Sequence, residues 1–221
     1  MRISELFKVP EPRSKAYNIV NETFGAVTHG IGFFLSVAGL VMLIIKTIPE
    51  HDTLKLVSFI IYGSSLILLY LFSTLYHSLV FTRARHVFQI FDHSSIFILI
   101  AGSYTPYTLV GVGGRFGWIM FVLIWVLAVL GILYKIFLVG KYGKFETILY
   151  IIMGWLVILA SKPLVATLGP TGFMLLVSGG VAYTFGALLY SMRNVPFIHV
   201  IWHIFVMLGS ILMYFSILFY L

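Results

Sequence analysis

Long apolar runs separated by short polar breaks dominate the chain. A hydrocarbon layer about 30 Å thick requires roughly 20 apolar residues in a spanning helix, and seven runs are of that order. The runs are too long and unbroken for the strands of a membrane barrel, and an open sheet edge cannot be satisfied in lipid. The predicted transmembrane helices cover Val27–Ile48, Leu54–Val80, Val87–Leu109, Phe116–Phe137, Thr147–Ser161, Thr171–Met192 and Pro196–Tyr220.

Proline, glycine and other helix-ending residues mark the breaks between the runs. They are Pro49, Asp52, Gly113, Gly114, Pro163, Gly169, Pro170 and Pro196. The pattern predicts an all-α membrane protein of seven transmembrane helices, with an N-terminal segment over residues 1–23 and one transmembrane domain over residues 24–221.

The composition changes this picture in two ways. Of the 221 residues, 61% are hydrophobic and 10% are charged, which excludes a water-soluble domain of this size. Cysteine is absent, so no disulfide can form and a metal site is limited to histidine and carboxylate ligands. The N-terminal residues mix charges with two prolines, unlike a cleavable signal peptide, so the first helix is expected to direct insertion.

Basic residues are distributed unequally between the two ends of the predicted helices. One side holds ten and the other holds four, and the richer side is normally cytoplasmic. We therefore expect a cytoplasmic N-terminus and an outer C-terminus. The net charge of +7 and the pI near 9.6 follow from this asymmetry and imply no nucleic-acid partner. The ten are Arg2, Lys8, Arg13, Lys15, Arg83, Arg85, Lys135, Lys141, Lys144 and Arg193, and the four are Lys46, Lys55, Arg115 and Lys162.

A few ionisable residues fall inside the runs, near their predicted cytoplasmic ends. His77 closes the second run, Asp92 opens the third, and His199 and His203 open the seventh. Such residues are costly within a membrane and tend to face a bundle interior or a cavity. The predicted topology places all of them at one depth.

The spacing of these residues predicts a metal site. Ser73 and His77 are four residues apart, as are His199 and His203, so each pair lies on one face of its helix. Three imidazoles with Asp92, bound directly or through a water, form a site with one exchangeable position, as in catalytic zinc. This donor set favours Zn²⁺ over Mg²⁺ or Ca²⁺, and Fe(II) remains an alternative. A hydrogen-bonded structural pair is the other reading of the two histidines in the seventh run.

Other ionisable residues are secondary candidates. Glu22 and His29 lie seven residues apart at the start of the first helix, where they either support the metal ligands from behind or cap and anchor that helix. His51 lies in a predicted loop, His86 belongs to a basic stretch, and His93 is expected to point away from the site, so none of these three is assigned to the metal.

Three segments resemble the signature motifs of the hemolysin III branch of the progestin and adipoQ receptor family. They are Ser73–His77 (STLYH), Phe91–Ser95 (FDHSS) and His199–His203 (HVIWH), and the first-helix segment from Glu22 to Gly30 also fits. The likeness covers nearly the whole chain, with the motifs in the expected order. It implies seven helices, a cytoplasmic N-terminus and location in a bacterial plasma membrane.

The resemblance also implies a chemistry for the site. A zinc ion is expected on His77, His199 and His203, with a water between the metal and Asp92 and with Ser73 nearby. One departure is visible, because receptor-type members carry an asparagine where Gly25 stands here. Support of the metal site by the first helix is therefore expected to differ from that in the receptors.

The wider superfamily includes alkaline ceramidases, which suggests a hydrolase that acts on a membrane lipid amide or ester. In this hypothesis Asp92 is the general base and Ser73 helps to stabilise the oxyanion, while the lipid enters from the inner leaflet. A pore-forming, hemolysin-like protein without such chemistry is the alternative, although a pore requires polar residues along a whole span and here they crowd one leaflet. A receptor-like lipid sensor is the third reading, and the short loops leave little room for a signalling partner.

Overall fold

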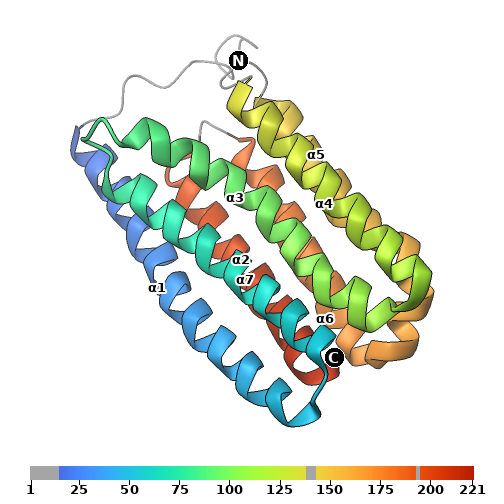
Figure 1. Ribbon diagram of the computed structural model, residues 1–221. Coiled ribbons are helices and arrows are strands. Elements are labelled where there is room, and N and C mark those ends of the chain that lie inside the picture. Colours follow the sequence, from blue (N-terminus) through green and yellow to red (C-terminus); the bar gives the residue numbers. More distant parts are fainter. Residues whose placement is uncertain (1–14, 138–142, 193–194) are drawn as a thin grey trace.

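The computed structural model describes residues 15–137, 143–192 and 195–221, and the regular structure within these ranges is entirely helical (Figure 1). Helical structure is the expected solution for apolar runs in lipid, because every interior backbone group is then paired within its own segment. The helices are α1 Lys15–Thr47, α2 Thr53–Ser78, α3 Arg85–Pro106, α4 Gly114–Phe137, α5 Gly143–Trp155, α6 Ser161–Tyr190 and α7 Ile198–Tyr220, with short helical pieces at Ile48–Glu50, Tyr107–Val112 and Leu156–Ala160.

Six segments of the described chain are long and apolar enough to cross a membrane, where the sequence predicted seven. The difference lies in Phe145–Tyr190, one 46-residue segment that contains most of α5 and all of α6. Trp155 Nε1 donates to Thr184 Oγ1 at 3.0 Å, although a straight helix would separate residues 29 positions apart by about 44 Å. The chain therefore doubles back within this segment, where Gly169 leaves the helical region at φ 64° and ψ 177°.

Helix α1 begins at Lys15, well before the predicted start at Val27. Its first turns are polar, so a hydropathy pattern does not count them. They are held instead by the residue just before α7, since the backbone N–H of Phe197 donates to the Tyr17 hydroxyl at 2.7 Å and the two rings lie 4.9 Å apart. Residues 15–23 of the predicted N-terminal segment are therefore helical and continuous with the first span.

Two predicted proline boundaries shift for different reasons. Pro163 does not end a helix, because it lies in the first turn of α6, where its missing N–H leaves no hydrogen bond unmade. Pro196 does not open the last helix, because Phe197 adopts a left-handed conformation at φ 57° and α7 starts at Ile198. The predicted turn at Gly113 and Gly114 is confirmed, with φ of 65° and 55°.

The charge asymmetry can be followed only in part. Several basic residues that were predicted on the cytoplasmic side lie outside the described residues, as do residues 1–14 of the N-terminal segment. These basic residues are Arg2, Lys8, Arg13, Lys141 and Arg193, together with the side chain of Lys144.

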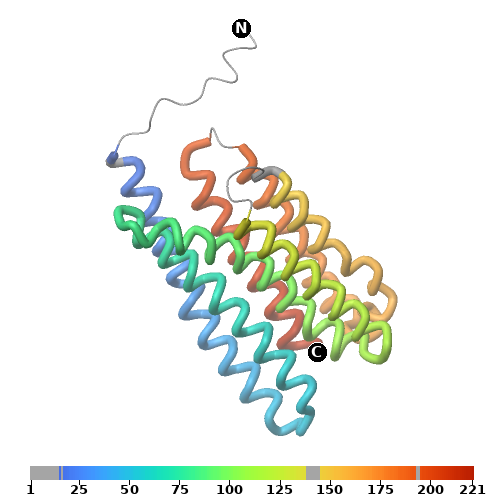
Figure 2. The backbone as a smooth tube through the Cα atoms, turned by 45° about the horizontal axis from the view of Figure 1, so that its top comes forward, coloured from blue at the N-terminus to red at the C-terminus, as the bar shows by residue number. Residues whose placement is uncertain are grey.

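The helices form one bundle in which α1 and α2 run side by side and α7 packs against both α1 and α6 (Figure 2). Helix α3 lies between α2 and α4, and α5 contacts both α3 and α4. The buried core is apolar along much of its length and is built around Phe59, Tyr62, Leu164, Leu168 and Ile217. This arrangement brings the start of α1, the end of α2 and the starts of α3 and α7 to one end of the bundle.

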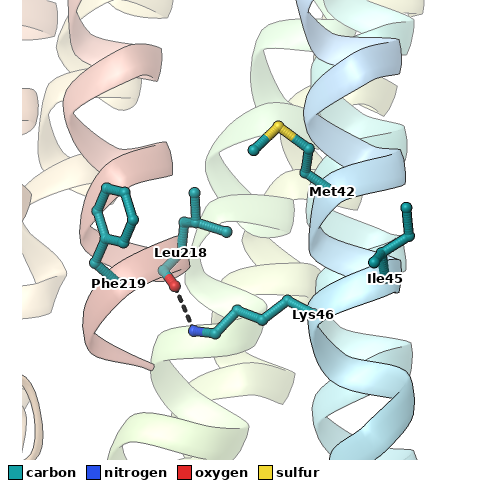
Figure 3. A pocket seen from close by; sticks show the side chains of 5 residues that line it. All are labelled: Met42, Ile45, Lys46, Leu218 and Phe219. Atoms are coloured by element: carbon teal, nitrogen blue, oxygen red, sulfur yellow. Dashed lines mark hydrogen bonds between the residues drawn. The ribbon is translucent and has the colours of Figure 1, made fainter.

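A groove of about 450 Å³ lies at the opposite end, between α1 and α7 (Figure 3). Met42 and Ile45 line it from α1, and Leu218 and Phe219 line it from α7. Lys46 crosses the groove and donates to the Leu218 carbonyl oxygen, which places a cation at the C-terminal end of a helix dipole. The groove is remote from the histidines, and its lysine serves to cap α7.

Close packing of α2 on α3 depends on Gly102. A Cβ at this position would lie 2.2 Å from Ser65 Oγ, and Ser65 is buried and held by its hydrogen bond to the Tyr62 carbonyl oxygen at 2.6 Å. We expect Gly102→Ala to destabilise the bundle by about 1–3 kcal/mol and to lower its melting temperature in detergent by roughly 3–10 °C. Gly154→Ala is the control, because a Cβ there meets nothing within 4 Å. Equal melting temperatures for the two variants would contradict this account.

Candidate metal centre

Helices α2 and α7 bring three histidines together at the end of the bundle that holds the start of α1. His77 comes from the last turn of α2, while His199 and His203 come from the first two turns of α7. One ring nitrogen from each lies within 4.8 Å of the others, and the Nε2 atoms of His77 and His199 are 3.1 Å apart. His77 and His203 are buried and His199 is half-buried.

Glu22 of α1 orients the His77 ring. Its Oε2 lies 2.6 Å from His77 Nδ1, and its Oε1 accepts from Arg85 Nη2 at 3.3 Å. Because an ionised carboxylate only accepts, Nδ1 of His77 carries the proton and donates. The lone pair of His77 is therefore on Nε2, which faces the other two histidines.

Thr28 orients His203 in the same way. The Thr28 hydroxyl donates its single proton to main-chain carbonyls of α1, with the Phe24 oxygen at 2.8 Å. It must then accept at its contact with His203 Nδ1, 3.2 Å away, so this nitrogen carries the proton. His203 is left with an Nε2 lone pair, as a metal ligand requires.

The three imidazoles fit a single cation. Two nitrogens bound tetrahedrally to one zinc-sized ion, each at about 2.0–2.1 Å, lie about 3.3 Å apart, close to the 3.1 Å between His77 and His199. A carboxylate or hydroxyl that fixes the far nitrogen is the usual support of a metal-bound histidine. His77, His199 and His203 can therefore hold a metal ion.

Gly25 makes the approach of α1 to His77 possible. A Cβ at this position would lie 2.8 Å from His77 Nδ1 and 2.9 Å from its Cγ, closer than real Cβ contacts. The departure noted in the sequence, glycine in place of asparagine, thus lies directly against a histidine of the cluster. With no side chain at Gly25, the Glu22 carboxylate reaches the ring.

Asp92 and Ser73 are buried beside the histidines, with exposed fractions of 9% and 1%. Asp92 interacts electrostatically with His77, and its carboxyl group lies within interaction distance of the Ser73 hydroxyl. The group of ligand atoms that lie within 4.8 Å of one another consists of one nitrogen from each of the three histidines and does not include an Asp92 oxygen. The structure thus places both predicted catalytic residues close to His77, one of the three histidines.

His29 is also buried at the centre, with 3% of its surface exposed. Its ring stacks on His203, with centroids 3.5 Å apart and planes 13° apart, and meets Tyr70 edge-on at 5.0 Å. Of the two secondary candidates, Glu22 contacts His77 through its carboxylate, and His29 contacts His203 through the face of its ring.

Sequence reasoning missed a second polar cluster, formed by His93, Lys135 and Glu146. Lys135 Nζ donates to both Glu146 oxygens, at 3.0 and 2.9 Å, and to His93 Nδ1 at 2.9 Å. Lys135 lies at the predicted cytoplasmic end of its helix, yet it is 6% exposed, because the last turn of α4 packs it against the start of α5. The sequence does contain an indication of this ion pair, because Lys135 near the end of one helix and Glu146 near the start of the next carry opposite charges.

Gly25→Ala is expected to weaken metal binding, because the added Cβ displaces His77 or breaks its contact with Glu22. Loss of such support typically lowers metal affinity about 10- to 100-fold. Competition with a chromophoric chelator, together with the metal content of purified protein, measures the effect.

The matched control is Gly30→Ala, also in α1, where the nearest atom to a Cβ is Thr74 Cγ2 at an ordinary 3.8 Å. Its metal affinity should equal that of the native chain. Native affinity in Gly25→Ala would show that the close approach of α1 is not needed.

Comparison with known proteins gives a consistent answer. A family model described as "Haemolysin-III related" matches residues 17–214. The chain is 46% identical to "Hemolysin-3" of Bacillus cereus over 91% of its own length and 92% of the relative's, and 45% identical to "Hemolysin-3 homolog" of Bacillus subtilis over 92% and 96%. It is 31% identical to the human "Monocyte to macrophage differentiation factor" over 73% and 69%. The two Bacillus relatives fit a bacterial plasma membrane, and the chain is an integral, multi-pass membrane protein that belongs to the haemolysin-III related family.

Proposed function

We propose that this protein is a zinc-dependent hydrolase that cleaves an amide or ester bond of a membrane lipid. The observation that supports the proposal is the convergence of three imidazoles, two of them with their lone pairs fixed toward one point, beside a buried carboxylate within an apolar bundle. Zinc is favoured as the metal because imidazole-rich, thiol-free sites of this size suit it. Fe(II) is the competing ion, and metal analysis separates the two.

The chain's own residues supply the remaining chemistry. Zinc, when bound, supplies a positive charge that polarises a carbonyl group and acidifies water. Asp92 accepts a proton from the attacking water and returns it to the leaving nitrogen or oxygen, so that no net proton is gained or lost. The Ser73 hydroxyl donates to the carbonyl oxygen as negative charge develops on it. The surrounding apolar helices exclude bulk water and strengthen these interactions.

The proposed topology has seven spans, a cytoplasmic N-terminus and an outer C-terminus. The fold-back at Gly169 supports the count, since it divides Phe145–Tyr190 into two antiparallel passes. Arg83 and Arg85 support the orientation, because they lie at the histidine end of the bundle. In this orientation the metal centre lies within the inner leaflet, and a lipid of that leaflet is the substrate.

A membrane-perturbing activity is the second candidate, favoured by the name "Hemolysin-3" of the Bacillus cereus relative. Its support within the bundle is weak. Tyr70 and Tyr183 both place their hydroxyls 2.8 Å from Ser210 Oγ, so these buried polar groups bond to one another across helices and do not line a conduit.

Asp92→Asn is expected to lower lipid hydrolysis by at least about 100-fold while one metal ion per chain is retained, because the amide cannot accept the proton. Mass spectrometry of lipids incubated with the purified protein measures turnover, and elemental analysis measures the metal. Asp52→Asn is the matched control, since Asp52 caps α2 at the far end of the bundle and asparagine caps equally well.

Two outcomes would reverse this proposal. Equal turnover by native and Asp92→Asn protein would remove the general base from the mechanism. Leakage of dye-loaded liposomes that persists when His77, His199 and His203 are all changed to alanine would favour membrane perturbation instead.

The topology is tested separately with reporter fusions. A fluorescent protein that folds only in the cytoplasm should be bright at the N-terminus and dark after Leu221, while alkaline phosphatase should show the reverse. Equal reporter behaviour at the two ends would require an even number of spans.

A further inference from the structure

The groove between α1 and α7, at the end of the bundle opposite the histidines, begins where the two helices stop touching. The Tyr214 hydroxyl donates to the Gly39 carbonyl oxygen at 3.0 Å, and a Cβ at Gly39 would lie only 3.0 Å from the Tyr214 ring. Seven residues or about 10 Å further along α1, the gap is wide enough for the whole Lys46 side chain to cross it (Figure 3). The groove of about 450 Å³ therefore extends from a closed tyrosine contact to a lysine bridge.

The walls of the groove are apolar and open to the side of the bundle. Met42 and Ile45 of α1 and Phe219 of α7 are all exposed. The Phe219 ring stacks on that of Phe215, with centroids 5.6 Å apart and planes 11° apart, so the α7 wall is flat and aromatic. Exposed apolar side chains at the edge of a membrane bundle contact acyl chains, which are as apolar as leucine. A lipid chain can therefore enter this groove from the bilayer.

Lys46 places a positive charge in the groove without an acidic partner. Among the described residues its ammonium group donates to the Leu218 carbonyl oxygen and forms no ion pair. Lys55 differs, because it pairs with the neighbouring Glu50 at 2.6 Å and so occupies the carboxylate closest at hand. An ammonium group has three N–H donors, and a charge within a span is costly unless it is paired. Lys46 thus has both the charge and the spare donors to bind an anion.

We propose that the groove binds an anionic phospholipid from the leaflet opposite the histidines. The phosphate group binds Lys46, since phosphate oxygens accept strong, charge-assisted hydrogen bonds from an ammonium group. One acyl chain lies between Met42 and Phe219. A headgroup without a cation of its own, as in phosphatidylglycerol, complements the single unpaired charge, whereas the cation of phosphatidylcholine opposes it. The inference goes beyond the proposed function, because it requires neither the metal nor turnover.

The test measures binding of dioleoyl phosphatidylglycerol to the full chain in detergent by native mass spectrometry. Lys46→Gln keeps an N–H donor for the Leu218 carbonyl oxygen and removes the charge, so it should bind the first lipid about 5-fold or more weakly. Lys46→Arg keeps the charge and should retain the native affinity. The native chain should also bind dioleoyl phosphatidylcholine more weakly than phosphatidylglycerol. Lys162→Gln is the matched control, since it removes the same charge from an exposed lysine in the first turn of α6.

A second pair of variants tests the acyl chain. Met42→Trp fills the groove and leaves Lys46 in place, so it should also weaken binding of phosphatidylglycerol. Val41→Trp is its control, because Val41 is 49% exposed against 54% for Met42 but does not line the groove.

Equal affinities of the native chain and Lys46→Gln for phosphatidylglycerol would overturn the site. An equal loss in Lys162→Gln would do the same, since net charge alone would then explain the binding. A dimer that Met42→Trp abolishes, with lipid affinity unchanged, would assign the groove to a second copy of the chain instead. None of these measurements uses hydrolysis, so a chain without lipid turnover that binds phosphatidylglycerol through Lys46 would leave this site standing while the hydrolase proposal fails.

Discussion

The contact between the Glu22 carboxylate and His77 is the interaction on which the centre depends. It joins α1 to α2, fixes the proton on His77 Nδ1 and directs the Nε2 lone pair toward α7. A carboxylate in this position is costly unless it is paired, and Arg85 supplies a second partner for it. The contact also requires that Gly25 have no side chain, so a backbone property of α1 controls the orientation of a ring on α2.

The bundle contains two kinds of buried polar cluster, and their hydrogen bonds distinguish them. Around Lys135 each donor has an acceptor, and the ion pair with Glu146 ties α4 to α5 while His93 adds α3. Such a cluster stabilises helix packing and has no free group to offer a ligand. Around the histidines the pattern is different, because within the described part of the chain neither ring nitrogen of His29 makes a hydrogen bond of normal geometry, and three further imidazoles converge on one point.

Much of this was readable in the sequence, and the exceptions have physical causes. Four-residue spacing placed His199 and His203 on one face, and the ends of the apolar runs placed His77 at the same depth. Hydropathy scores residues one at a time, so it did not reveal the partners of Lys135 and missed the polar first turns of α1. The pairing of Glu22 with His77, the two fixed tautomers and the role of Gly25 depend on the register between helices, which no single helix encodes.

Tyrosine hydroxyls extend the polar centre toward the middle of the bundle, where the sequence pattern is apolar. Tyr70, which meets His29 edge-on, shares Ser210 with Tyr183, so one serine of α7 bonds to both α2 and α6. These bonds hold α7 at a fixed height beside α2. Because α7 also carries His199 and His203, the same bonds fix the distance of both histidines from His77. The buried hydroxyls therefore serve the metal centre through helix position.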